Sequence, residues 1–166
     1  MSTSLVSLAS LVNAFSPVTP QLRVAAIIAR QDRILLVEHR KGGQRYWVLP
    51  GGRLQGRETL EAALRRELKE ELSLEAGIGR LLIVCETLAP DRHVVNLIYH
   101  AEVGESAEPH LDRADPVLAG WQWVTADQLP RLDFRPPIAD AVRAVLAENS
   151  VGPVRVLGDT WRPELR

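Results

Sequence analysis

The chain has 166 residues, of which 46% are hydrophobic and 25% charged, a composition close to that of an average globular domain. Twenty Lys and Arg residues against 21 Asp and Glu residues give a net charge of -1. This balance argues against duplex nucleic acid as a partner, because phosphate neutralisation requires clustered basic residues. A small anionic substrate stays compatible with it, since the local placement of charge matters more than the sum.

The single cysteine, Cys85, excludes an intramolecular disulfide and a multi-cysteine zinc site. It lies in the apolar run 81–85 and is predicted to be a small buried hydrophobe. No apolar stretch reaches the roughly 18 residues of a membrane span. The first twenty residues hold no Lys or Arg, which argues against a signal peptide. We therefore expect a cytoplasmic protein without a membrane segment.

A chain of this length is predicted to form one domain, in residues 21–150. Residues 1–20 are expected to be an N-terminal arm or a short helix, because apolar residues recur there at helical spacing before two prolines. Residues 151–166 are expected to form a C-terminal tail docked on the domain. That tail contains a β-rich run at 154–157 and a tryptophan, Trp161.

Between these ends, short apolar runs rich in β-branched residues predict strands, and turn signals separate the first two as a hairpin. The predicted strands are 22–28, 34–38, 46–49, 80–85, 94–103 and 119–124. Helices are predicted at 60–72, with Thr59 as its N-cap, and at 138–148. Helices interleaved with a mostly β chain predict an α/β fold in which a mixed sheet lies between helices.

The helix at 60–72 carries the chemistry. Three leucines spaced by four residues define its buried face: Leu64, Leu68 and Leu72. Three acids, Glu67, Glu70 and Glu71, share one arc of the same helix, and Glu71 falls within the leucine stripe. That position is unusual for a surface carboxylate.

A solvated, charged face is the ordinary explanation of such a helix, and Arg66 with Glu70 is an i,i+4 pair that supports it. That explanation does not account for Glu67 and Glu71, which lie one turn apart and repel each other. Burying an uncompensated charge is also costly. A divalent cation removes both problems, and Mg²⁺ prefers a few carboxylates together with waters and phosphate oxygens.

A glycine turn, Pro50-Gly51-Gly52, precedes the helix, and the combined pattern resembles the Nudix box. That box reads Gly, five residues, Glu, seven residues, Arg-Glu, an aliphatic, any residue, Glu-Glu, any residue, Gly, an aliphatic. The matching residues of this chain are Gly52, Glu58, Arg66-Glu67-Leu68, Glu70-Glu71 and Leu74. The one departure is Ser73, which stands where the family has glycine and is expected to fit the helix end less well.

The resemblance implies a Nudix hydrolase domain at 21–150, an α/β/α sandwich with the box as a loop-helix-loop. It implies that Glu67, Glu70 and Glu71, with the Gly51 carbonyl, bind Mg²⁺, for which Mn²⁺ can substitute. Glu58 would pair with Arg66 and fix the loop against the helix. The general base is either a glutamate of the box or a later acid, for which Asp112 and Asp115 are candidates.

The implied activity is hydrolysis of a diphosphate bond in a nucleoside diphosphate derivative, with ADP-ribose or a nucleotide sugar favoured. Pro90 stands at a spacing beyond the box that is typical of ADP-ribose hydrolysing members, although a proline there is also an ordinary turn residue. Arg23, Arg45 and Arg92 are candidates for phosphate contacts. The candidates for stacking on a base are Tyr46, Trp121 and Phe134, and Asp115 is a further candidate for substrate binding.

Two other functions stay open at this stage. The first is a nucleoside triphosphate or dinucleoside polyphosphate pyrophosphohydrolase, which differs only in substrate. The second is a sensor that binds a nucleotide metabolite without cutting it, which the intact Glu-Glu pair disfavours. The expected partner is a small nucleotide, without nucleic acid or membrane, and a homodimer is compatible with the sequence.

Overall fold

The computed structural model describes residues 19–111 and 115–163. The arm or helix expected before residue 19 and the candidate base Asp112 lie outside the described residues. The elements, in chain order, are β1 (Gln21–Arg30), β2 (Arg33–Lys41), β3 (Gln44–Val48), α2 (Leu60–Leu72), β4 (Ala76–Ala89), β5 (Arg92–Val103), β6 (Leu118–Thr125), the 3-10 helix η2 (Ala126–Arg131), α3 (Ala139–Ala147) and β7 (Arg155–Asp159).

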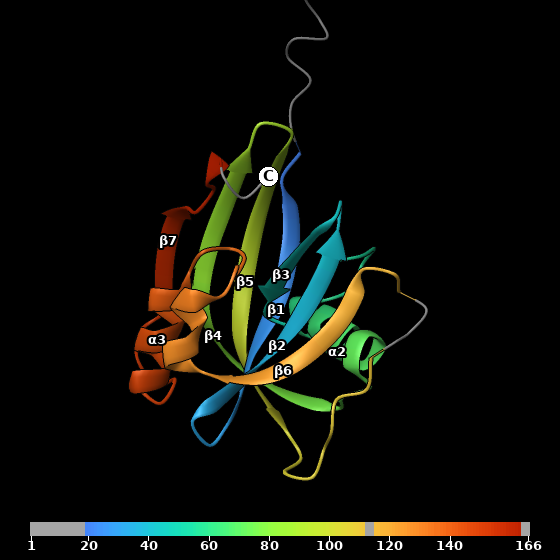
Figure 1. The fold of residues 1–166 in the computed structure, drawn as a ribbon, viewed down its shortest axis with the longest axis vertical. Coiled ribbons are helices and arrows are strands. Elements are labelled where there is room, and N and C mark those ends of the chain that lie inside the picture. Colours follow the sequence, from blue (N-terminus) through green and yellow to red (C-terminus); the bar gives the residue numbers. More distant parts are fainter. Residues whose placement is uncertain (1–18, 112–114, 164–166) are drawn as a thin grey trace, which may run out of the picture.

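The strands form a seven-stranded mixed sheet in the order β3-β2-β1-β5-β4-β7, with β6 paired to β2 (Figure 1). The β1–β5 and β4–β7 pairs are parallel, and the others are antiparallel. The strands of the two hairpins, β1–β2 and β4–β5, are longer than the predicted runs. β4 and β5 pair along their whole length, from Ala76 with Val103 to Ala89 with Arg92, whereas β1 and β2 pair only beside their turn. Pro90 lies in the turn between β4 and β5, as an ordinary turn residue does.

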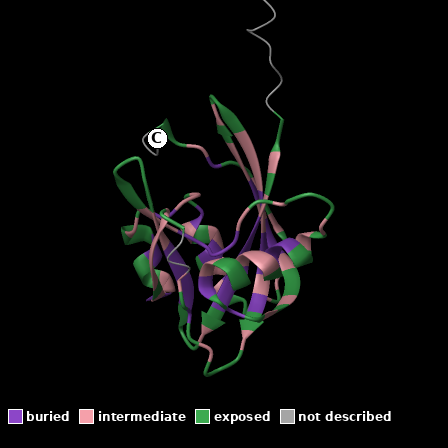
Figure 2. Cartoon of the chain, turned by 90° about the vertical axis from the view of Figure 1, so that its right-hand side faces the viewer, coloured by how far each residue is buried: buried purple, intermediate pink, exposed green. Residues whose placement is uncertain are grey.

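The sheet is buried on both faces, which explains why β1 reads as a continuous apolar run. Val24, Ala26 and Ile28 pack in a core with the leucines of α2. Ala25 and Ile27 point the other way, into a core with α3. The helices thus lie on opposite sides of the sheet, and buried residues concentrate between the layers (Figures 1 and 2). The predicted α/β/α sandwich is confirmed.

Helix α2 begins and ends where the sequence predicts. The Thr59 hydroxyl accepts a hydrogen bond of 3.2 Å from the N–H of Ala62, which caps the first turn. At the other end, Ser73 adopts a left-handed conformation, with φ 57° and ψ 25°, and its N–H donates to the Lys69 carbonyl. Ser73 therefore occupies the position that glycine fills best, which agrees with the departure noted in the sequence.

Cys85 lies fully buried in the core on the α3 side, and burial raises the pKa of its thiol to about 11. The prediction that Cys85 is a small buried hydrophobe is confirmed. Across residues 19–111 and 115–163, none of the helices combines the length and apolar character needed to cross a bilayer.

Candidate active site

The turn before α2 is held against β1 as if it were a further strand. The N–H groups of Val24 and Ala26 donate to the carbonyls of Gly52 and Pro50, both at 2.9 Å. Gly51 has φ +135°, and a Cβ at this position would overlap the Val24 carbonyl. Only glycine lets the chain pass this close to β1, so the sequence Gly51-Gly52 fixes the path of the loop.

Two of the three predicted acids meet this turn. A side-chain oxygen of Glu71 accepts a hydrogen bond of 3.0 Å from the N–H of Gly51. The Glu67 carboxylate lies directly against Gly52, where a Cβ would overlap it. The side chain of Glu67 is only 12% exposed. The fold therefore brings two carboxylates, from successive turns of α2, to the same glycine pair.

The environment of Glu71 is that of a buried acid. Burial raises the pKa of Glu71 to about 7, although the positive charge of Arg23 and the Gly51 N–H oppose this rise. The neighbouring charges of Glu67 and Asp115 raise the pKa further. An ionised Glu71 is thus costly in the protein alone, and a cation beside it would relieve that cost.

Arg66 connects the helix to the loop through a network of charged hydrogen bonds. It binds Glu58 in a bidentate arrangement, at 3.0 Å from Nε and 2.7 Å from Nη2. Its Nη1 also donates to Glu67 at 2.8 Å and to Glu70 at 3.0 Å, and its Nη2 donates to the Arg53 carbonyl. The pair that the resemblance implied, Glu58 with Arg66, is present in the structure.

Glu70 differs from the other two acids. Its side chain is 58% exposed and turns to Arg66 rather than to the glycine pair. The helical spacing predicts Glu70 at the edge of the three acids. The hydrogen bond to Arg66 holds the Glu70 side chain on the solvent side of the helix. The structure thus brings Glu67 and Glu71 to the glycine pair, while Glu70 joins Glu67 only through the shared Nη1 of Arg66.

Arg23, on β1, faces the turn from the side opposite to the helix. Its Nη2 donates a hydrogen bond of 2.6 Å to the Gly51 carbonyl. Burial lowers the pKa of the Arg23 guanidinium, and the negative charges of Glu71 and Glu67 oppose this effect. Because Arg23 also lines the adjacent pocket, it joins the acidic turn to the space beside it.

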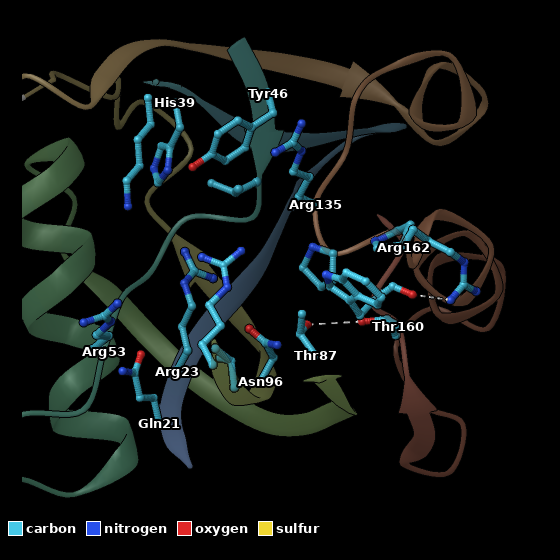
Figure 3. A pocket seen from close by; sticks show the side chains of 17 residues that line it. Gln21, Arg23, His39, Tyr46, Arg53, Thr87, Asn96, Arg135, Thr160 and Arg162 are labelled. Atoms are coloured by element: carbon cyan, nitrogen blue, oxygen red, sulfur yellow. Dashed lines mark hydrogen bonds between the residues drawn. The ribbon is translucent and has the colours of Figure 1, made fainter. Parts of the chain in front are cut away.

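That pocket has a volume of about 260 Å³ and extends from β1 to the C-terminal tail (Figure 3). Six of the side chains that line it carry a positive charge: Arg23, Lys41, Arg53, Arg92, Arg135 and Arg162. No Asp or Glu is found among the described residues that line it. A cavity with this lining attracts an anion carrying several charges, even though the net charge of the chain is close to zero.

The substrate-binding candidates divide between the pocket and its surroundings. Arg92 and Tyr46 line the pocket. Arg45 does not: its side chain is 61% exposed, and its Nε lies 3.7 Å from Glu38. Asp115 lies outside the lining and accepts a hydrogen bond of 2.8 Å from the N–H of Val117, although it is near enough to raise the pKa of Glu71.

Two aromatic candidates belong to the cores instead. Phe134 is buried on the α3 side, and Trp121 packs on the α2 side. Several lining residues are not among the candidates that the sequence indicates, among them Arg53, Asn96, Arg135, Trp161 and Arg162. Only the isolated tryptophan near the C-terminus gave a signal, since such a residue generally docks on the domain.

The donor atoms of the site are oxygens, which a hard cation prefers. Within the described ranges, no three His, Cys, Asp or Glu side chains are gathered closely enough to enclose a metal by themselves. Mg²⁺ does not need such a cage, because it keeps several waters and binds phosphate oxygens. Glu67, Glu71 and the Gly51 carbonyl supply the oxygen donors that it prefers.

Comparison with known proteins identifies the family. The model of the NUDIX domain matches residues 19–145, which include β1, the glycine turn and α2. The chain therefore belongs to the Nudix family and is a pyrophosphohydrolase.

Among curated proteins, the chain is similar to the phosphatase NudJ of Escherichia coli strain K12, with 27% identity over 145 residues, 84% of this chain and 92% of that protein. A MutT Nudix hydrolase structure from Burkholderia pseudomallei shows 32% identity and a TM-score of 0.56, covering 66% of this chain and 85% of that one. An ADP-ribose pyrophosphatase structure from Streptococcus suis shares the fold, with 21% identity, a TM-score of 0.62, and coverage of 85% and 100%.

Proposed function

We propose that the protein hydrolyses, with Mg²⁺, the diphosphate bond of a nucleoside diphosphate derivative, with ADP-ribose or a nucleotide sugar as the first candidate substrates. One observation carries the proposal. The paired carboxylates of Glu67 and Glu71 meet a glycine turn, and Arg23 links this turn to a pocket lined by six cationic side chains. This arrangement suits a substrate with several negative charges. The arginines would bind its phosphates, and one end of it would lie beside the two carboxylates.

The Gly51 carbonyl has two lone pairs, so a donor from Arg23 and a bound cation can share it. Glu67 and Glu71, with Glu70 as the third predicted carboxylate ligand, would complete the protein's share of the coordination. When bound there, Mg²⁺ would neutralise phosphate charge and lower the pKa of an attacking water. Mn²⁺ would supply the same chemistry with the same donors.

The side chains of the chain itself have separate tasks in this mechanism. Arg23 and Arg92 would bind and orient the diphosphate, because guanidinium groups bind phosphate oxygens in a bidentate manner. Arg66 and Glu58 would keep the glycine loop in place on α2, as their bidentate bond does here. Water attacks one phosphorus, the bridging oxygen leaves with the other phosphoryl group, and a nucleoside monophosphate and a second phosphorylated fragment result.

The nearest rival substrates are nucleoside triphosphates and dinucleoside polyphosphates, which carry more charge and would also suit an all-cationic lining. The experiment is therefore a panel of ADP-ribose, nucleotide sugars, triphosphates and dinucleoside polyphosphates, assayed with Mg²⁺, with Mn²⁺ and with a chelator. Product analysis in ¹⁸O water identifies the phosphorus that is attacked. Activity confined to the triphosphates would refute the preference for ADP-ribose or a nucleotide sugar. Undiminished activity in chelator would refute the metal requirement.

Glu71→Gln is the matched variant, because glutamine keeps the shape and an oxygen that can accept the Gly51 N–H bond. We expect kcat to fall by roughly a thousandfold or more, since the variant lacks a charged ligand. The exposed Glu105→Gln should retain full activity. Retention of turnover by Glu71→Gln would remove the basis of the proposal.

A further inference from the structure

The floor of the pocket is one face of the sheet. On β5 the lining residues are Arg92, Val94 and Asn96, which alternate along the strand and therefore share a face. Arg23 of β1 is paired with Asn96, and Thr87 of β4 is paired with Val94. Three neighbouring strands thus place their side chains in the same floor.

Asn96 is an unusual residue for this position. In residues 19–111 and 115–163, the buried polar side chains are those of Asn96, 4% exposed, and Thr160, 7% exposed, and both line the pocket. Asparagine is uncommon in strands, and the flanking residues of the same face, Val94 and Ile98, are apolar. An aliphatic side chain at position 96 would be buried at lower cost. Packing alone therefore does not explain the amide.

The Asn96 amide is held in place by the neighbouring strand. It forms a hydrogen bond with the thiol of Cys85, its paired residue on β4. A thiol is a weak partner, whereas a side-chain amide has two N–H donors and a carbonyl acceptor with two lone pairs. The bond to Cys85 therefore orients the amide and leaves it the capacity to bind a group in the pocket.

Further uncharged polar side chains lie next to Asn96. The hydroxyl of Thr87 is 3.3 Å from that of Thr160, which donates to the Glu86 carbonyl at 2.7 Å. In Figure 3, Asn96 and Thr87 stand between Arg23 and Thr160. The floor thus offers neutral donors and acceptors directly beside an arginine that faces the acidic turn. Neutral groups of this kind suit hydroxyls, while phosphate oxygens suit the guanidinium groups.

The chemistry of the proposed substrates places a sugar at this point. In ADP-ribose, each phosphate of the diphosphate carries a ribose, so a ribose adjoins the phosphates whichever way the molecule binds. Its hydroxyls both donate and accept hydrogen bonds, as the amide of Asn96 does. Neighbouring strands are about 5 Å apart, so the ribose next to a phosphate bound by Arg23 comes within reach of Asn96.

We propose that Asn96 determines the sugar specificity of this enzyme: its amide binds the 2′- or 3′-hydroxyl of the ribose beside the diphosphate. The inference rests on the proposed function, because it takes the substrate to be a nucleotide derivative held by Arg23. A sugar without these hydroxyls would leave a buried amide unpaired, and a site of this kind discriminates strongly against such an analogue.

The test compares the binding of AMP and 2′,3′-dideoxy-AMP to the full chain, measured by calorimetry with Mg²⁺. The two ligands share the phosphate and the base and differ only in the hydroxyls. The wild type should bind AMP about tenfold more tightly. Asn96→Leu, of similar size, should bind AMP only as tightly as dideoxy-AMP, whose affinity should not change. Asn96→Ala, which adds no bulk, should give the same result if leucine does not fit.

Gln122→Leu is the matched control, because it replaces an exposed amide on β6 that does not line the pocket. It should keep the wild-type preference for AMP. A wild type that binds the two ligands equally or binds neither, a preference that persists in the Asn96 variants, or equal losses of both ligands in them would overturn the inference. AMP has no diphosphate bond, so these outcomes concern binding alone and are distinguishable from turnover that survives in Glu71→Gln.

Discussion

The guanidinium of Arg23 donates a hydrogen bond of 2.6 Å to the carbonyl oxygen of Gly51. The N–H of the same glycine donates to Glu71. One peptide turn is therefore held by a cation on the sheet side and by a carboxylate on the helix side. Each of the two side chains also affects the pKa of the other. Arg23 opposes the rise in the pKa of Glu71, and Glu71 opposes the fall in the pKa of Arg23.

Arg23→Gln should reduce affinity for an anionic substrate. Glutamine can still donate to a carbonyl, but it brings no charge to the pocket and leaves Glu71 without its positive neighbour. We expect KM to rise roughly tenfold, the effect of losing one charged hydrogen bond. Steady-state kinetics measure this, and Arg33→Gln, at the exposed first residue of β2, is the control that should leave KM unchanged. A normal KM in Arg23→Gln would show that this arginine only shapes the loop.

Arg66→Lys should destabilise the protein. Lysine cannot reproduce the bidentate bond to Glu58 or contact Glu67 and Glu70 at the same time. We expect a loss of about 1–3 kcal/mol in the free energy of unfolding, measured by chemical denaturation. The neighbouring Arg65→Lys is the control, because its pair with Glu61 is exposed and 3.5 Å long, and such pairs contribute little. Equal stability of the two variants would contradict the structural role of Arg66.

The local patterns of the sequence predict α2 and its loop well. Thr59 and Ser73 mark the ends of the helix, and the spacing of Leu64 and Leu68 sets its buried face. These features depend on residues close together in the chain, for which capping and periodicity are direct physical signals. The position of Glu71 within the leucine stripe likewise predicts its burial.

The pocket follows from the packing of distant elements, and no local pattern encodes it. Arg23 and Arg92 come together because β1 pairs in parallel with β5, a contact that spans much of the chain. Arg162 reaches the same space only because β7 docks on β4. Glu70 was grouped with the other acids on helical geometry, but the bond to Arg66 decides where its side chain lies.

Ser73→Gly should stabilise the protein. The serine adopts φ 57°, a left-handed conformation that costs a residue with a Cβ about 1 kcal/mol, and glycine adopts it without strain. Part of this gain is offset by the greater freedom of glycine in the unfolded chain. We expect a net gain of about 0.5 kcal/mol and a small rise in Tm. Ser106→Gly, in an exposed turn, should give no such rise, and a lower Tm for Ser73→Gly would contradict the strain argument.

The metal-free protein should lose stability as the pH rises, because Glu71 is a buried acid. The pKa of Glu71 is raised to about 7 from 4.5, so the folded state holds a proton that the unfolded state releases. This group therefore stabilises the fold fully below about pH 4.5, and the stabilisation is lost as the pH rises through about 7. The shift corresponds to about 3 kcal/mol, and Glu71→Gln, which cannot ionise, should be more stable than the wild type at pH 8 but not at pH 4.

Thermal unfolding of both proteins in chelator, across that pH range, measures the difference. Adding Mg²⁺ at pH 8 should raise the Tm of the wild type and have little effect on the variant, because the cation stabilises only the ionised carboxylate. Glu105→Gln, in an exposed loop, serves as the control and should follow the wild type at every pH. If the wild type and Glu71→Gln showed parallel pH profiles, Glu71 would not be the buried acid that the geometry describes, and a cation would have no uncompensated charge to relieve there.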